Sequence, residues 1–276
     1  MNAKSVAPNT RRKLYGQNYL HWRKKGRSRQ DDDRRERLGV GLAREGKKTL
    51  VIDTDSQFSL TTSLGVKEPE KLQFSLATVM RSIIDEKVFD PTACIIHHPE
   101  GVDLLPANSS LTGIELALVP LIGREIILRR YIEMIKPQYD FILIDTPPTL
   151  DLLTVNGLSA ADSVIIPVVP KYLDAKGLEL LLKSIAQVHR AINKNLSIGG
   201  ILLTMVDRRA SFTREIISLV ENTYGSRIRI FGDHIPRSVR AAESTAQGVS
   251  IFKHDPNGLV AAAYAALTRE VLTDAA

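Results

Sequence analysis

Two short apolar runs that each end in aspartate constrain the fold of this 276-residue chain more than any other feature. Residues 49–53 read Thr-Leu-Val-Ile-Asp, and residues 140–145 read Asp-Phe-Ile-Leu-Ile-Asp. Continuous apolar runs rich in β-branched residues are typical of parallel strands that are buried on both faces. Stretches with helical spacing follow such runs along the chain. This alternation predicts repeated βαβ units, and therefore an α/β fold doubly wound around a mostly parallel sheet.

The other expected elements follow the same alternation. Further strands are expected over 102–106, 163–169, 198–205 and 228–231, and helices over 76–84, 111–135, 178–192, 212–224 and 259–271. Sheets of this kind bind ligands at the carboxyl ends of their strands. We therefore look for chemistry in the loops that follow Ile52, Ile144 and Leu203.

Three carboxylates occupy these expected strand ends. Asp53 and Asp55 follow the first apolar run, and Asp145 ends the second. Phosphate-binding folds use aspartates in this position to hold Mg²⁺ and its waters beside a nucleotide. A single aspartate after a strand is more often a turn or helix N-cap residue. Two such runs in one chain favour a metal–nucleotide site over that simpler interpretation.

Four motifs carry a resemblance to a known family. They are Ile-Asp-Thr-Asp-Ser-Gln at 52–57, Phe-Ile-Leu-Ile-Asp-Thr-Pro-Pro at 141–148, Leu-Leu-Thr-Met-Val-Asp-Arg-Arg at 202–209 and Ile-Pro-Arg at 235–237. In this order and spacing, over roughly residues 38–272, the chain resembles the ParA/Soj partition ATPases, in the deviant-Walker group that also contains MinD. The resemblance implies a P-loop NTPase-like fold, with ATP and Mg²⁺ as the bound groups.

The resemblance also implies roles for particular residues. Asp55 would orient and activate the attacking water, Asp53 would support it or the metal shell, and Asp145 would hold Mg²⁺ through water. The residues that would line the adenine base of ATP are Met205, Asp207, Pro236 and Arg237. Without the resemblance, Met205 could equally be a core residue, and Asp207 could equally begin a turn.

The phosphate-binding loop of the family is missing from its expected place. A P-loop needs glycine-rich backbone amides, a lysine for the β- and γ-phosphates and a hydroxyl for Mg²⁺. The family form is Lys-Gly-Gly-x-Gly-Lys-Thr-Thr, whereas residues 25–38 have no glycine after Gly26 and carry three aspartates at 31–33. These aspartates would repel phosphate. We expect the first strand and the P-loop to be disrupted.

A reading-frame offset explains this segment. A coding run for Gly-Val-Gly-Lys-Thr-Thr-Thr-Ala-Val-Asn, read one base early, translates into the eleven residues Arg27 to Arg37. Residues 1–48 contain 15 Lys and Arg against 5 Asp and Glu, while the rest of the chain contains 22 against 26. We therefore divide the chain into an aberrant basic segment, 1–37, and a ParA-like α/β domain, 38–276. The alternative is a genuine, divergent basic N-terminus.

The resemblance implies three kinds of partner. They are a ParB-like centromere-binding protein, non-specific DNA and a second copy of the chain in the ATP-bound dimer. Seven arginines against three acids lie within 208–240 and would contact DNA phosphates, although a solvated surface with scattered ion pairs is as good an interpretation. The candidate DNA-binding residues are Arg208, Arg209, Arg214, Arg237 and Arg240.

The C-terminal helix and the cysteine content limit where the protein can act and which groups it can bind. Residues 258–276 are rich in alanine with one arginine, which favours packing on the domain over a basic membrane anchor. The single cysteine, Cys94, excludes a multi-cysteine metal site within one chain. No apolar run is long enough to span a membrane. We expect a cytoplasmic, nucleoid-associated protein.

Taken together, these features predict an ATPase of chromosome or plasmid partitioning, with ATP-dependent dimerisation and non-specific DNA binding. Whether this particular chain is an enzyme is left open, because loss of the P-loop is expected to impair it. The alternative is a non-enzymatic remnant, an adaptor or a regulator of sporulation or replication that keeps only partner or DNA contacts.

Overall fold

The computed structural model describes residues 13–18, 35–147, 149–170, 174–207 and 209–275. Within these residues eight strands form a sheet in the order β3-β4-β2-β5-β1-β6-β7-β8. All neighbouring strands are parallel except β3 and β4. The strands are β1 (Lys13–Asn18), β2 (Thr49–Asp53), β3 (Ile96–His97), β4 (Asp103–Leu105), β5 (Phe141–Thr146), β6 (Ser163–Val168), β7 (Ser197–Val206) and β8 (Ile235–Pro236).

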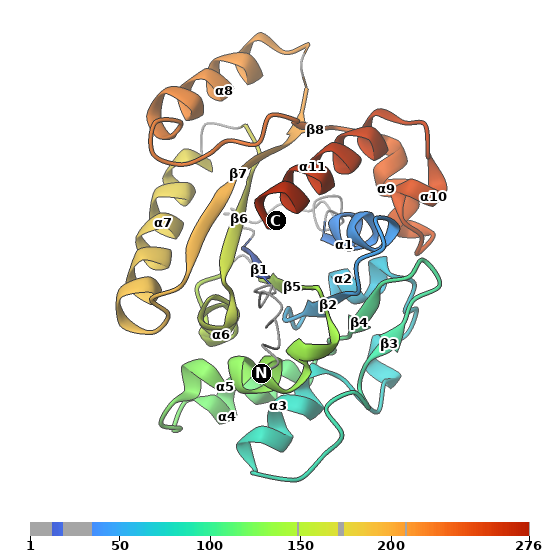
Figure 1. Cartoon of the computed structure of the whole chain (residues 1–276), viewed down its shortest axis with the longest axis vertical. Coiled ribbons are helices and arrows are strands. Elements are labelled where there is room, and N and C mark those ends of the chain that lie inside the picture. The colour runs from blue at the N-terminus through green and yellow to red at the C-terminus, as the bar shows by residue number, and fades with distance from the viewer. Residues whose placement is uncertain (1–12, 19–34, 148, 171–173, 208, 276) are drawn as a thin grey trace, which may run out of the picture.

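Helices cover both faces of the sheet (Figure 1). The α-helices of the described residues are α1 (Arg35–Arg44), α2 (Ser59–Ser63), α3 (Leu76–Ile84), α4 (Leu111–Leu118), α5 (Ile127–Ile135), α6 (Leu152–Ala160), α7 (Asp174–Ala191), α8 (Ser211–Tyr224), α9 (Val239–Ala246), α10 (Ile251–His254) and α11 (Leu259–Ala275). This layered arrangement confirms the predicted doubly wound α/β fold.

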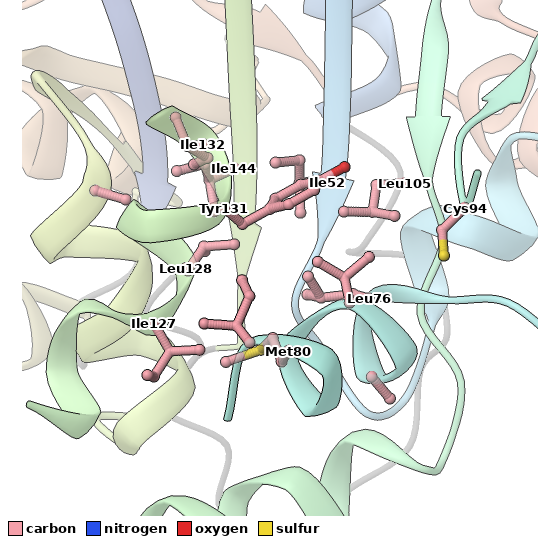
Figure 2. Close-up of a cluster of buried hydrophobic side chains, with 14 of the residues drawn as sticks. Ile52, Leu76, Met80, Cys94, Leu105, Ile127, Leu128, Tyr131, Ile132 and Ile144 are labelled. Carbon is pink, nitrogen blue, oxygen red and sulfur yellow. The ribbon is translucent and has the colours of Figure 1, made fainter. Parts of the chain in front are cut away.

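Side chains of one buried strand belong to two hydrophobic clusters, because successive side chains point to opposite faces of the sheet. Leu50 and Ile52 of β2 join the cluster formed with α3 to α6, whereas Val51 between them joins the cluster formed with α1 and α11. Figure 2 shows the first cluster, in which Tyr131 of α5 lies among aliphatic side chains from β2, β4 and α3. A third cluster lies between β6, β7, α7 and α8.

Two of the predicted elements differ from the structure. The expected helix over 111–135 is two helices, α4 and α5, separated by a turn. Pro120 lacks the N–H that would continue the helix, and Gly123 adopts φ 72°, so the chain turns between them. The expected strand over 228–231 makes only one bridge, from Ile230 to Ile201 of β7.

The first strand, which we expected to be disrupted, is present. Residues Lys13–Asn18 occupy the centre of the sheet and pair in parallel with β5 on one side and β6 on the other. A gap at this place would leave backbone N–H and C=O groups of both neighbours unpaired, and any extended segment satisfies them through its backbone. The predicted disruption of the P-loop concerns residues 25–38, of which 25–34 lie outside the described residues.

Close packing of α6 on β5 generates a prediction about Gly157. A Cβ atom there would lie 2.6 Å from Thr146 Cγ2 and 3.4 Å from Ile144 Cγ2. We expect Gly157→Ala to lower the free energy of unfolding by about 1–3 kcal/mol, because the added methyl overpacks this contact. Urea denaturation measures the change. Gly113→Ala in α4 is the matched control: no atom lies within 4 Å of the added Cβ, so we expect a gain of up to about 1 kcal/mol. Equal effects of the two substitutions would contradict the packing argument.

Candidate functional site

The carboxyl ends of three neighbouring strands bring the predicted acidic residues together. In the parallel register of β2 and β5, Asp53 lies opposite Asp145. On the other side of β5, Gln17 of β1 pairs with Asp145 and Asn18 pairs with Thr146. Both aspartates are buried, at 0% and 2% exposure. The sheet therefore holds two carboxylates side by side at the edge where folds of this class bind ligands.

Asp53 is fixed by three hydrogen bonds from the segment that follows it. Thr61 of α2 donates its backbone N–H to Asp53 Oδ2 at 2.9 Å and its hydroxyl to the same oxygen at 2.7 Å. The backbone N–H of Asp55 donates to Asp53 Oδ1 at 3.1 Å. Thr54 ties the strand end to β5, because its backbone N–H donates to the Asp145 carbonyl at 2.9 Å. These contacts fold residues 54–61 back over the ends of β2 and β5.

The environment of Asp53 alters its acidity. Burial raises the pKa of this carboxyl from 3.8 to about 6, because the charged form loses its hydration. The hydrogen bonds from Thr61 and Asp55 act in the opposite direction, since they stabilise the charged form. The carboxylate of Asp55 adds a smaller repulsion that raises the pKa.

Asp55 lies at the rim of the site, half-buried, two residues beyond the strand. Its Oδ1 accepts the backbone N–H of Gln57 at 2.9 Å, and its carbonyl accepts the N–H of Phe58 at 2.9 Å. Phe58 adopts φ 46°, so the backbone reverses before α2 begins. The carboxylate is thereby held next to Asp53 while retaining access to solvent.

The four residues expected to line the adenine base of ATP come from two neighbouring segments, β7 and β8 with the residues that follow each strand. Thr204 of β7 pairs with Ile235 and Val206 with Pro236, so one extra residue, Met205, bulges from β7 with φ 55°. The backbone N–H of Arg237 donates to the Val206 carbonyl at 3.2 Å. This pairing places Met205 and Asp207 beside Pro236 and Arg237. The exposed Asp207 accepts the backbone N–H of Arg209 at 3.1 Å, as in a turn.

The arginines expected to bind DNA do not form one compact cluster. Arg208 lies outside the described residues. Figure 1 shows α8, which carries Arg214, at the upper left of the molecule and α9, which carries Arg240, at the right beside α10. Arg240 donates to Glu243 at 3.1 Å. The four described candidates are all exposed: Arg209, Arg214, Arg237 and Arg240.

Sequence reasoning missed the role of two threonines. Thr61 holds Asp53 from eight residues away, and Thr54 holds the carbonyl of Asp145. The sequence contained a signal for this role, because a polar stretch rich in hydroxyl groups follows the pair Asp53 and Asp55.

In the described part of the chain no group of three His, Cys, Asp or Glu side chains could hold a metal, and no helix there is long and apolar enough to cross a membrane.

The chain is similar to several known proteins. A family described as "AAA domain" matches residues 35–198. "Sporulation initiation inhibitor protein Soj" of Bacillus subtilis is 37% identical over 85% of this chain and 90% of its own length. "Chromosome-partitioning ATPase Soj" of Treponema pallidum is 35% identical over 85% and 89%. Cobyrinic acid a,c-diamide synthase from Mycobacterium smegmatis, crystallised with ADP and magnesium, superposes with a TM-score of 0.78 at 29% identity over 94% of both chains.

The raised pKa of Asp53 predicts a pH dependence of stability. The folded state binds this proton more tightly than the unfolded state, so the contribution is fully present below pH 3.8 and is lost as the pH rises through about 6. Relative to Asp53→Asn, we expect the free energy of unfolding to fall by about 2 kcal/mol between pH 4 and pH 7. Urea titrations of both chains in metal-free buffer measure the difference. A difference that stays constant across this range would contradict the burial argument, whatever the offset between the two chains.

Proposed function

This chain belongs to the ParA/Soj family of partition ATPases, and we propose that it is a chromosome- or plasmid-partitioning ATPase whose phosphate-binding loop has been lost through a reading-frame offset. The observation that carries the proposal is the contrast between two halves of one site. The acidic half, at Asp53 and Asp145, is assembled as a nucleotide site requires. The phosphate-binding half, in residues 25–38, has a sequence that cannot bind phosphate.

The acidic half fits Mg²⁺. Carboxylate oxygens are hard ligands that suit this ion, and Mg²⁺ characteristically uses one or two protein carboxylates together with waters and substrate phosphates. Asp145, buried at the end of β5, would hold the ion through a water, and Asp53 beside it would support the metal shell. The ion would supply charge neutralisation at the phosphates of ATP.

The phosphate-binding half does not fit in the chain as it stands. Backbone amides of a glycine loop and a lysine would have to follow β1, but the sequence after Gly26 contains no glycine before Gly39 and places three aspartates at 31–33. Like charges repel, so this segment opposes a bound triphosphate. We therefore assign no hydrolytic step to the unrepaired chain. The matched family region begins at residue 35, which accords with a foreign segment before it.

In a chain with the loop restored, Asp55 would orient the attacking water. Its position supports this role, since it lies at the solvent-accessible rim, next to the buried pair. The base would lie at the β7–β8 bulge, lined by Met205, Asp207, Pro236 and Arg237.

Binding to DNA and self-association belong to the same proposal. The exposed arginines around β8 and α9 would contact DNA phosphates without sequence preference. They occupy separate elements, so a dimer bound to ATP would be needed to present enough of them on one surface. A ParB-like centromere-binding protein would stimulate hydrolysis, and the protein would act in the cytoplasm on the nucleoid.

The lack of a P-loop sequence also favours a second, non-enzymatic function. If the chain is expressed as it stands, it would act without hydrolysis, as an adaptor or regulator that keeps partner or DNA contacts. The strand order supports this alternative, because β1 fills the central position of the sheet and the strands around it remain paired. Nucleotide binding separates the two functions.

The test compares the chain with a repaired version. Residues 27–37 are replaced by Gly-Val-Gly-Lys-Thr-Thr-Thr-Ala-Val-Asn, which then follows Lys25 and Gly26 directly and restores the family spacing. We expect the repaired chain to bind ATP with Mg²⁺ at least about 100-fold more tightly, a difference of roughly 2.7 kcal/mol, because it regains the amide cradle and the lysine. Isothermal titration calorimetry measures both affinities. Replacement of the inserted lysine by alanine is the control and should abolish most of the gain. Equal affinity of the original and repaired chains would refute the proposal.

A further prediction concerns hydrolysis by the repaired chain. We expect Asp55→Asn to lower kcat by about 100-fold or more, because the amide cannot accept a proton from water, and to change ATP affinity by less than about threefold. Phosphate release and nucleotide titration measure the two quantities. Asp233→Asn removes an exposed carboxylate elsewhere and should leave both unchanged. A variant at Asp55 with full kcat would exclude the assigned role.

A further inference from the structure

A cavity of about 350 Å³ opens at the amino ends of β6 and β7, beside the last turns of α11 (Figure 1). In a parallel sheet this edge lies opposite the one that carries Asp53 and Asp145, so the cavity is separate from the proposed nucleotide site. We call it the β6–β7 cavity and define it by residues on its floor and rim: Asp162, Ser163, Gly199, Arg229, Val271 and Asp274.

A buried hydroxyl group without a partner faces the β6–β7 cavity. Ser163, the first residue of β6, is 8% exposed, and its Oγ forms no hydrogen bond with any residue that the structure describes. A Cβ atom on Gly199 of β7 would lie 2.6 Å from this Oγ. The hydroxyl therefore points into the space that the glycine leaves open. Because a buried polar group without a partner is destabilising, a hydrogen-bonding group that entered the cavity would be stabilised there.

The floor around this hydroxyl is apolar. Ile165 of β6, Val271 of α11 and Phe231 line the cavity and are each 1% exposed. The guanidinium carbon of Arg229 lies 4.9 Å from the centroid of the Phe231 ring and covers it. An apolar lining with a few placed polar groups is typical of sites for small molecules, and this volume is at the small end of their range of about 300–1,000 Å³.

The rim of the cavity is acidic. The guanidinium of Arg229 donates to Glu270 at 2.5 Å and to Asp274, both on α11, so it is already engaged by two carboxylates. Asp162, which precedes β6, lies 3.8 Å from the ammonium of Lys136, too far for a hydrogen bond. Across the ion pairs that border the cavity, three carboxylates therefore face two cations. This excess of negative charge favours a cationic ligand over an anionic one.

We propose that the β6–β7 cavity binds a small aliphatic ammonium compound that carries a neutral hydroxyl group at its other end. The ammonium would lie at the rim beside Asp162 and Asp274, the carbon chain would cover Ile165 and Val271, and the hydroxyl would bond to Ser163 Oγ. The inner end has to be neutral, because a second charge at the apolar floor would lose its hydration without a counter-ion. This assignment does not depend on ATP binding.

The test titrates the isotope-labelled full chain, without nucleotide, with 5-aminopentanol and follows the backbone N–H signals by NMR. We expect saturable shifts at Ser163 and Gly199, whereas the signals of Asp53 and Asp145 stay in place. The reference compounds are 5-hydroxypentanoate, which has the opposite charge, and pentylamine, which lacks the hydroxyl. The first should bind at least about tenfold more weakly, and the second about threefold to tenfold more weakly.

Three results of this titration would overturn the proposal. They are the absence of saturable shifts with 5-aminopentanol, equal binding of 5-hydroxypentanoate, and equal binding of pentylamine. The first would show that the cavity takes no such ligand, the second that the acidic rim does not select charge, and the third that Ser163 makes no bond to the ligand.

Variants assign the two ends of the ligand. Ser163→Ala should abolish the preference for 5-aminopentanol over pentylamine, because only the hydroxyl contact is lost. Asp274→Asn should weaken the binding of both amines by about threefold to tenfold, because it removes one charge of the rim. Asp85→Asn is the matched control, at a carboxylate that pairs with Lys87 at 2.9 Å, and should leave binding unchanged. Circular dichroism confirms that each variant is folded. Folded Ser163 and Asp274 variants that bind like the original chain would refute the site.

Discussion

The backbone ladders on the two sides of β5 are the constraint on which the rest of the structure depends. They set β2 and β1 in register with β5, and this register alone places Asp53 beside Asp145. A slip by one residue would turn every side chain of the strand to the other face and bury the wrong set. The bond from Thr54 to the Asp145 carbonyl secures the same register where the strands end.

The same ladders explain why the segment Lys13–Asn18 can occupy the centre of the sheet although its sequence is not that of a typical buried strand. Parallel pairing is made by backbone groups, which β1 provides whatever its side chains are. Phosphate binding has no such tolerance, because it needs glycine conformations, a lysine and a hydroxyl at fixed positions. A change in the sequence before α1 would therefore affect the phosphate-binding half of the proposed site much more than the architecture. The acidic half lies further along the chain, at Asp53 and Asp145.

Agreement between sequence and structure is best where burial is complete. The strand over 49–53 and the helix over 76–84 have the bounds that the sequence predicts, since their apolar spacing leaves a single way to bury them. Prediction failed where local chemistry interrupts a regular pattern. The apolar spacing of 111–135 continues through Pro120, but the backbone of that proline does not permit one helix. The central strand was misjudged because its neighbours, and not its own side chains, require it.

The sequence by itself determined the fold class and the carboxylates at the strand ends, because each of these is written in short contiguous runs. Tertiary structure alone decided that Thr61 holds Asp53 and that β8 pairs with β7 around Met205. These contacts join residues on different elements. Their geometry follows from how helices pack on the twisted sheet, which no local pattern of residues specifies.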